Sequence, residues 1–280
     1  MILVTGATGT VGREVVAQLV TAGKKVRALT RDPGKASFDA RVEVVAGDLG
    51  KPETLRKALE GAERVFSLST GPQLGVQERN LAAESSQAGV KHIVKLSVLG
   101  VGSGSTNPIT GWHEVAEKSI RDSGIAWTFV RPGMFMSNAL NWAPAVKAYG
   151  KIFQPYADGR IVPIHPRDVA AVAVKALTTP GHEGQSYPLT GPDALNMVEV
   201  AQILSEAVGK PIAYVPVTEE AARDGMSKAG VPALLVEGLM QLAAFVRSGG
   251  GQVLPTLERL LGRRGLTWRE WARENASAFR

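Results

Sequence analysis

The stretch that decides the fold is VTGATGTVG, residues 4–12, which ends an apolar run and opens a segment of helical periodicity. Its glycines recur every third residue, whereas the strict dinucleotide fingerprint places its first two glycines two residues apart. This spacing still meets the physical requirements of a dinucleotide-binding turn, because glycine allows positive φ and lets the backbone approach a pyrophosphate at a helix N-terminus. We therefore expect phosphate-binding groups at Gly6, Thr8, Gly9, Thr10, Val11 and Gly12.

Around this turn, the first 131 residues alternate β-branched runs with helical-period segments, which is typical of βαβ units. The predicted strands are Ile2–Val4, Lys25–Thr30, Val42–Ala46, Arg64–Leu68, His92–Ser97 and Trp127–Arg131. The predicted helices between them are Val11–Ala22, Pro52–Glu60, Gln77–Ala88 and Trp112–Asp122. The pattern indicates an α/β fold with a Rossmann-like, doubly wound parallel sheet. Such sheets bind ligands at the first strand-to-helix turn, which argues against the alternative of a glycine-rich turn without a ligand.

After Arg131 the alternation weakens, and Gly and Pro become frequent. Later segments predict helices near 166–177, 196–208, 218–247, 255–261 and 267–276, and strands at 185–189 and 211–215. These elements are too intermittent to predict an independent second sheet. We expect a nucleotide-binding domain at 1–150, with 160–178 packing back onto it, and a smaller α/β cap at 151–280 that binds the substrate.

Composition excludes several kinds of chemistry. The chain has no cysteine, and none of its four histidines lies three or four residues from another, so no metal site is expected. A net charge of +6 without a run of five like charges disfavours a nucleic-acid partner. The absence of an 18-residue apolar stretch and of a charged leader predicts a cytoplasmic protein without a membrane partner. A monomer or a homodimer is expected.

The chain resembles the atypical branch of the short-chain dehydrogenase/reductase superfamily, in particular its NmrA-like and NAD(P)H quinone oxidoreductase-like members. The resemblance covers nearly the whole chain. It rests on TGATGTVG at 5–12, VRALTRDP at 26–33, AGDL at 46–49, WTFVRPGMFMSN at 127–138 and HPRDVA at 165–170. It implies an NAD(P)H-dependent oxidoreductase, a ketoreductase or quinone reductase. The alternative is a non-catalytic regulator that senses NADP(H) and acts through a protein partner.

The end of the second strand favours NADPH over NADH. An NAD site usually has an acidic residue there, whereas Arg31 offers a guanidinium that suits the 2′-phosphate. Lys35 is a weaker candidate, and a solvated loop cation is the alternative for Arg31. The resemblance implies further cofactor contacts at Asp48, Leu49, Ser69, Thr70, Gly71, Ser97, Pro132, Gly133 and Met134. Asp48 also fits a helix cap before Pro52.

The superfamily's catalytic tyrosine and lysine have no match in this chain, although Ser97 matches its serine. In the corresponding helix, His113 stands at the tyrosine position and Glu117 at the lysine position. Three alternatives remain open. His113 donates the proton as an imidazolium whose pKa Glu117 raises; solvent or the substrate supplies the proton; or catalysis is lost. An ordinary surface pair explains His113 and Glu117 equally well.

An apolar and aromatic set near the expected nicotinamide end predicts the substrate. Concave sites lined by such side chains favour flat apolar ligands, which suggests an aromatic or polycyclic ketone or quinone. The alternative is that these residues are ordinary core. The candidates are Trp112, Phe135, Met136, Asn138, Trp142, Phe153 and Tyr156.

Overall fold

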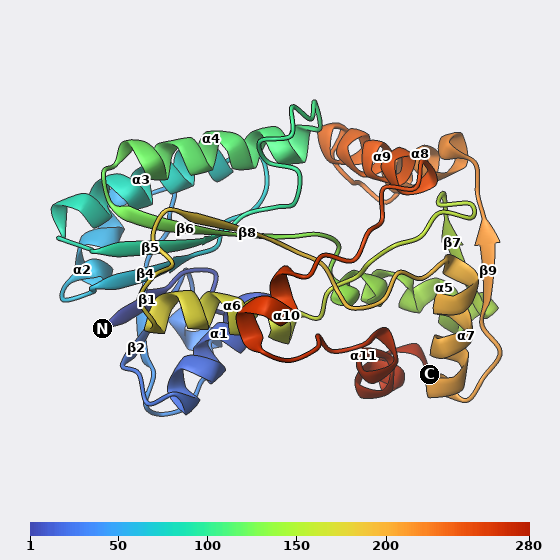
Figure 1. Ribbon diagram of the computed structural model, residues 1–280, viewed down its shortest axis with the longest axis horizontal. Coiled ribbons are helices and arrows are strands. Elements are labelled where there is room, and N and C mark those ends of the chain that lie inside the picture. The colour runs from blue at the N-terminus through green and yellow to red at the C-terminus, as the bar shows by residue number, and fades with distance from the viewer. The chain divides into compact units, whose positions relative to one another are not determined.

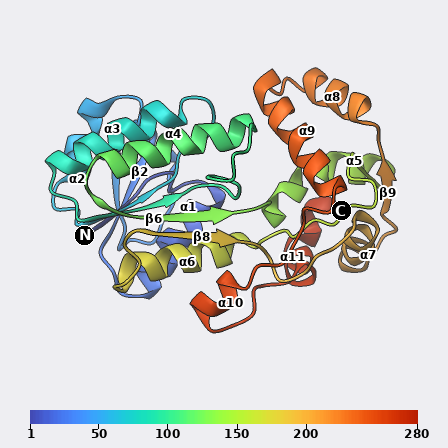
Figure 2. The same cartoon turned by 45° about the horizontal axis from the view of Figure 1, so that its top comes forward.

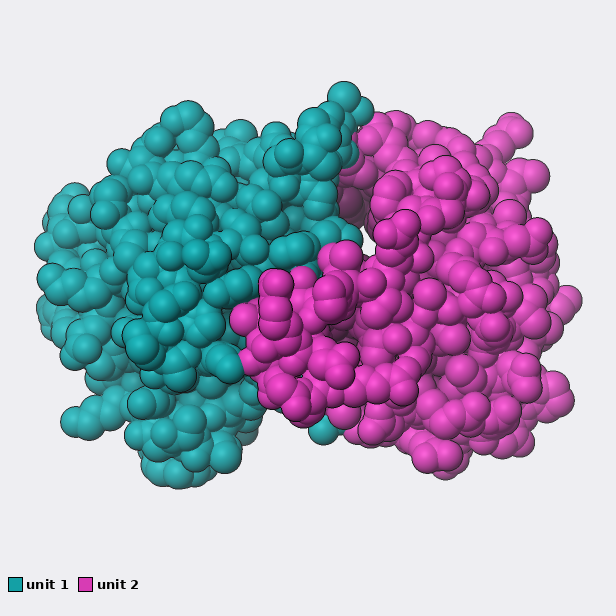
Figure 3. All heavy atoms as spheres, viewed as in Figure 1, with its two compact units in different colours: residues 1–106, 110–132, 166–189 teal, residues 107–109, 133–165, 190–280 magenta.

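The structure is a computed structural model that describes residues 1–280, and its chain divides into two units (Figure 3). Unit 1 comprises Met1–Thr106, Thr110–Pro132 and Pro166–Leu189. Unit 2 comprises Asn107–Ile109, Gly133–His165 and Thr190–Arg280. The first unit thus ends at Pro132 rather than at residue 150, and the segment that returns to it is 166–189 rather than 160–178.

Seven parallel strands form the sheet of unit 1, in the order β3-β2-β1-β4-β5-β6-β8. All seven match predicted strands within about two residues, including β8, which was predicted at 185–189 and lies beside β6. The pairing of β8 with β6 explains why the returning segment belongs to unit 1. The strands are β1 (Ile2–Val4), β2 (Val26–Thr30), β3 (Glu43–Ala46), β4 (Arg64–Ser67), β5 (His92–Leu96), β6 (Ala126–Pro132) and β8 (Gln185–Leu189).

Helices cover both faces of this sheet, as expected for a doubly wound fold (Figures 1 and 2). On one face, α1 (Thr10–Thr21) packs against α6 (Pro166–Thr178). The other face carries α2 (Leu55–Leu59), α3 (Leu74–Gln87) and α4 (Pro108–Asp122). Two short 3-10 helices, η1 (Pro33–Lys35) and η2 (Pro52–Thr54), lie in the connections.

The core between the sheet and the α2–α3–α4 layer is apolar and fully enclosed. Leu3, Ile93 and Phe129 from the strands pack with Leu59 and Leu81 from the helices, and each is at most 1% exposed. Because the strands are parallel, their carboxyl ends all open at one edge of the sheet. This edge presents the loops that carry the predicted cofactor residues.

Unit 2 is mainly helical, but it contains a small sheet that the sequence did not predict. Strands β7 (Lys151–Gln154) and β9 (Ala213–Pro216) pair in parallel. The expectation that no second sheet forms is therefore wrong, because β7 pairs with a strand about sixty residues further along the chain. The remaining elements are η3 (Met136–Trp142), α5 (Ala143–Tyr149), α7 (Met197–Val208), α8 (Glu219–Lys228), α9 (Ala233–Arg247), α10 (Thr256–Leu261), α11 (Trp268–Asn275) and η4 (Ala276–Phe279).

The core of unit 2 is built around α7 and α11. Trp268 stacks on Trp271 with ring centroids 4.8 Å apart, and its indole N–H donates to the carbonyl of Val200 at 3.2 Å. Asn196 and Glu199 form a capping box at the start of α7. No helix in the structure is long and apolar enough to cross a membrane, and no cluster of three or more histidine or acidic side chains is arranged to hold a metal ion.

Candidate functional site

The turn after β1, predicted to bind a pyrophosphate, depends on its glycines. Gly6 has φ of +58°, and a Cβ added to Gly12 would lie 2.1 Å from the Gly6 carbonyl oxygen, so a side chain there would fill the turn. Gly9 precedes α1 and has no side chain to cap it, and the first turn of the helix carries no acidic residue. The first amides of α1 therefore remain available to an anion. Val11 is 3% exposed and offers only its backbone.

The same turn is tied to the end of β4. The Thr5 hydroxyl accepts a hydrogen bond from the Leu68 amide at 2.8 Å and donates to the Leu68 carbonyl at 3.2 Å. A Cβ at Gly6 would lie only 2.9 Å from that carbonyl oxygen. Glycine at this position thus allows two strand ends to approach each other.

At the end of β2, Arg31 and Lys35 are in different electrostatic situations. Arg31 is exposed and has no hydrogen bond or ion pair, so its guanidinium is available. Lys35 is paired at 2.9 Å with Asp32, which also removes the carboxylate that would oppose a phosphate beside Arg31.

A further cation near this loop escaped the sequence analysis. Arg13, on the first turn of α1, donates through Nε to the Thr8 carbonyl at 2.9 Å, and its guanidinium lies 5.8 Å from the Phe38 ring centre. It joins the phosphate turn to the loop after β2. The sequence feature that could have identified Arg13 is its position directly after Gly12, at the start of the helix.

After β3, Asp48 holds its own turn rather than capping a helix. Its Oδ1 accepts from the Gly50 amide at 2.8 Å, and the 3-10 helix beginning at Pro52 has no side-chain cap. The capping alternative is thus wrong in detail. The neighbouring Leu49 is held through its carbonyl, which accepts from Asn80 at 2.9 Å.

The loop after β4 rests on a buried charge network. Ser69 donates to Glu78 at 2.6 Å, and Ser67 donates to the same carboxylate at 2.5 Å. Lys95 completes it with a 3.0 Å ion pair to Glu78, and both side chains are fully buried. The Ser69 hydroxyl proton is therefore engaged within the protein, whereas Thr70 is exposed and Gly71 takes φ of +83°.

A second buried network engages two of the three predicted catalytic residues. Glu117 is fully buried, and its carboxylate accepts from Ser97 at 2.7 Å. It also accepts from Arg131, at 2.9 and 2.6 Å, and from Arg121 at 2.8 Å. Glu117 is thus not part of a surface pair, as one alternative supposed. The only proton of the Ser97 hydroxyl points to Glu117, so Ser97 in this arrangement accepts hydrogen bonds but does not donate one to a ligand.

His113 is neutral, contrary to the expectation that Glu117 raises its pKa. Burial, and then the positive charge of Lys95, lower the pKa of His113 to about 3. Its Nδ1 is buried and has no hydrogen-bond partner. The charge of Glu117 is compensated by Arg121 and Arg131 instead. His113 is therefore a neutral imidazole at pH 7 rather than an imidazolium acid.

The residues expected around the nicotinamide fall into both units. Pro132 ends β6 in unit 1, while Gly133 and Met134 begin the unit 2 segment. Trp112 lies half-buried on α4 in unit 1.

In unit 2, Phe135 is half-buried, whereas Asn138 and Phe153 are exposed. Met136 and Tyr156 are instead buried in the core of this unit, with Trp142 packed against them. The burial of Met136 and Tyr156 agrees with the alternative of ordinary core, and burial also raises the pKa of Tyr156 to about 12.

The described geometry matches known proteins closely. A family model described as NAD(P)H-binding matches residues 6–180. The NAD(P)H azoreductase of Xenophilus azovorans is 42% identical over 283 aligned residues, which cover 100% of this chain and 99% of that protein.

Solved structures agree along the whole chain. The NADPH-dependent quinone oxidoreductase QOR2 of Escherichia coli, complexed with NADPH, is 31% identical with a TM-score of 0.86, covering 98% and 99% of the two chains. The triphenylmethane reductase of Citrobacter sp., complexed with NADP(H), is 30% identical with a TM-score of 0.85 and coverage of 99% and 100%. NmrA, a negative transcriptional regulator, is 20% identical with a TM-score of 0.75, a likeness that concerns the fold alone.

Proposed function

We propose a substrate class and a proton source on the premise that this chain belongs to the NAD(P)H-binding family, as an atypical short-chain dehydrogenase/reductase of the NmrA-like and quinone oxidoreductase-like kind. It is an NAD(P)H-dependent oxidoreductase that binds NADPH. The cofactor, when bound, supplies a hydride. We infer that the acceptor is a bulky, conjugated aromatic molecule, with quinones favoured over simple ketones.

The chemistry of the relatives supports a conjugated acceptor. Three of them are named for the reduction of azo compounds, quinones and triphenylmethane compounds, all of which carry an extended π system. Trp112 in unit 1 is half-buried, and in unit 2 Phe135 is half-buried and Phe153 is exposed. Each of them is therefore accessible to a ligand of this kind. Flat apolar molecules suit aromatic walls.

The observation that carries the proposal is the state of the three residues at the expected acid position. His113 is neutral, and the side chains of Ser97 and Glu117 are bonded to each other. A strong proton donor is thus missing from this set. Hydride addition to a quinone gives an anion whose charge is spread over the ring and oxygens, so water suffices to protonate it. A simple ketone gives a localised alkoxide that needs a positioned acid.

The phosphate turn and the β2 loop would hold the cofactor. The amides after Gly9 suit the pyrophosphate, and Arg31 with Arg13 suits the 2′-phosphate. Only Oδ1 of Asp48 is used within the turn, so its Oδ2 would accept from the adenine amino group. These residues fit NADPH better than NADH.

The test is NADPH oxidation by the purified protein, followed through the near-ultraviolet absorbance of NADPH. A naphthoquinone and an azo dye are expected to be reduced at least tenfold faster than an aryl ketone of similar size. NADPH binding without oxidation by any acceptor would contradict the enzyme proposal. Ketones that react as fast as quinones would contradict the proposed proton source.

A pH profile gives a second measure of the proton source. Since His113 is neutral throughout, turnover of the quinone is expected to show no decline through pH 6.5 that depends on this residue. His113→Gln is expected to reduce quinone turnover less than tenfold. A decline near pH 6.5 in the wild type that is absent in His113→Gln would establish an imidazolium acid and overturn the proposal.

A further inference from the structure

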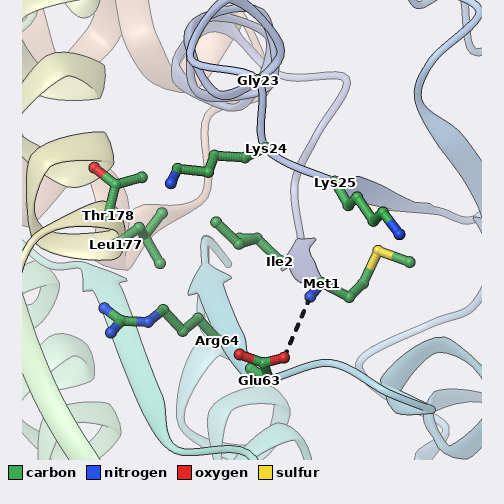
Figure 4. A pocket seen from close by; sticks show the side chains of 9 residues that line it. All are labelled: Met1, Ile2, Gly23, Lys24, Lys25, Glu63, Arg64, Leu177 and Thr178. Carbon is green, nitrogen blue, oxygen red and sulfur yellow. Dashed lines mark ion pairs between the residues drawn. The ribbon is translucent and has the colours of Figure 1, made fainter.

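A pocket of about 310 Å³ opens in unit 1 at the edge opposite the phosphate turn (Figure 4). It lies where β1, β2 and β4 begin and where α1 and α6 end, so none of the residues discussed above belongs to it. Its volume is near the lower end of the range for small-molecule sites, roughly 300–1,000 Å³. The lining residues are Met1, Ile2, Gly23, Lys24, Lys25, Glu63, Arg64, Leu177 and Thr178.

The charges of this pocket are strongly unbalanced. Lys24, Lys25 and Arg64 contribute three side-chain cations, and none of them is in an ion pair. The single carboxylate, of Glu63, lies 3.9 Å from the α-amino group of Met1. In Figure 4 the ends of Lys24 and Arg64 extend toward Leu177 and Thr178, whereas Lys25 extends to the opposite side and Glu63 faces Met1.

The helix ends do not remove this imbalance. The C-termini of α1 and α6 meet the pocket, and each carries roughly half a negative charge. Together they offset about one of the three cations. An excess of roughly two positive charges remains, so the three cations are more than the two helix C-termini need to neutralise their partial charges.

Arg64 provides the second, independent observation. Its Nη1 is buried and has no hydrogen-bond partner. In the sheet register Arg64 is opposite His92, whose Nδ1 is also buried without a partner. Burial and then the Arg64 charge lower the pKa of His92 to about 4. His92 is therefore neutral near pH 7 and does not attract an anion by charge. A buried guanidinium donor without an acceptor is costly. Because Nη1 is closed to solvent in this arrangement, a ligand anion would satisfy it only after a small movement of the Arg64 side chain toward the pocket.

We propose that this pocket binds a phosphate group, either inorganic phosphate or a small phosphate monoester, independently of the cofactor. A phosphate carries about 1.5 to 2 negative charges near pH 7, which matches the excess of the pocket. Its oxygens suit the planar fork of Arg64 and the mobile ammonium group of Lys24, while the charge of Lys25 contributes at longer range. The pocket is too small for a dinucleotide, so the ligand is a compact one.

The experiment uses protein saturated with NADPH, so that the cofactor's own phosphate sites are occupied. Inorganic phosphate is titrated at constant ionic strength and followed by histidine side-chain NMR and by calorimetry. The His92 signal, beside Arg64, is expected to shift saturably, while His113 and His165 serve as internal references. A glycerol phosphate titration distinguishes a monoester, which would bind more tightly, from free phosphate.

Arg64→Met is expected to weaken phosphate binding at least tenfold, because a charge-assisted donor is lost. Lys24→Met, at an exposed position, is expected to weaken phosphate binding severalfold. This variant keeps the proposal testable if Arg64→Met does not fold. Lys228→Met, in unit 2, removes the same unit of charge away from the pocket and is expected to leave binding unchanged.

Equal weakening by Lys228→Met, or equal effects of chloride and phosphate, would show charge screening only and overturn the proposal. Absence of a saturable His92 shift would also overturn it. None of these outcomes depends on turnover, so they are separate from a failure of the proposed reductase activity.

Discussion

Arg31 and Lys35 lie four residues apart in one loop, yet only one is free to bind a phosphate. Lys35 is paired with Asp32 at 2.9 Å, whereas the Arg31 guanidinium has no partner. A charge-assisted bond from Arg31 to the 2′-phosphate is worth about 1.5–3 kcal/mol, or roughly one to two decades of affinity. NADH lacks that phosphate and gains nothing from the residue.

Arg31→Ala is therefore expected to raise the Michaelis constant for NADPH by about 10- to 100-fold and to leave that for NADH nearly unchanged. Lys35→Ala, the matched control, is expected to change the NADPH constant less than about threefold, since its charge already serves a surface pair. Steady-state kinetics with both cofactors measures the ratio. An unchanged NADPH/NADH ratio in Arg31→Ala would contradict the assignment.

His113 shows how strongly one residue depends on its surroundings. Its spacing to Glu117 suggests an ion pair one helical turn apart, but Glu117 is held by Ser97, Arg121 and Arg131. Burial, and then the charge of the buried Lys95 from β5, lower the pKa of His113 instead. The residue that occupies the family's tyrosine position is thus held neutral rather than charged.

At the scale of elements, the β1–α1 turn depends on the close approach of its own backbone. A Cβ at Gly12 would lie 2.1 Å from the Gly6 carbonyl oxygen and 2.9 Å from Ala7 Cα. These are backbone atoms of the turn, which cannot move without opening it. The phosphate-binding shape and the helix start are therefore one feature.

Gly12→Ala is expected to weaken NADPH binding at least tenfold and to lower the free energy of unfolding by about 1–3 kcal/mol, the usual effect of overpacking. Gly111→Ala is the control, because a Cβ at this position on α4 meets nothing within 4 Å. That change is expected to stabilise the protein by about 0.5–1 kcal/mol without altering NADPH affinity. Denaturant unfolding and NADPH titration measure both effects, and equal outcomes for the two variants would refute the steric argument.

At the scale of the whole molecule, two histidines that are neutral in the folded state make stability depend on pH. The pKa of His92 is lowered to about 4 and that of His113 to about 3. The unfolded chain binds protons at these residues near pH 6.5, whereas the folded chain does not. Their contribution to stability is complete above pH 6.5 and is lost as the pH falls toward the folded values.

The free energy of unfolding is accordingly expected to fall by about 1 kcal/mol for each of these histidines between pH 6.5 and 5.5. His92→Gln and His113→Gln each remove one titrating group and are expected to flatten this dependence by that amount. Denaturant titrations at several pH values provide the measurement. A free energy that rises as the pH falls through this range would show that the histidines are charged in the folded protein.

Much of unit 1 followed from local sequence. The strand and helix bounds agree with periodicity within a few residues, and Gly23, Gly61, Gly89 and Gly124 end segments in the left-handed conformation that glycine favours. The doubly wound order and the phosphate turn followed from VTGATGTVG and its position after the first strand. The cofactor preference followed from one residue, Arg31, at a strand end that the pattern itself located.

The sequence by itself therefore determined the fold class and the cofactor, and it predicts the edge of the sheet at which the cofactor binds, because periodicity, turn chemistry and helix starts depend on neighbours along the chain. Only the tertiary structure decided the pairing of β7 with β9, the boundary at Pro132 and the states of His113, Ser97 and Glu117. Those features depend on which distant side chains meet. Lys95 and Arg131 set the electrostatics around α4 from separate strands, and no spacing within that helix encodes their approach.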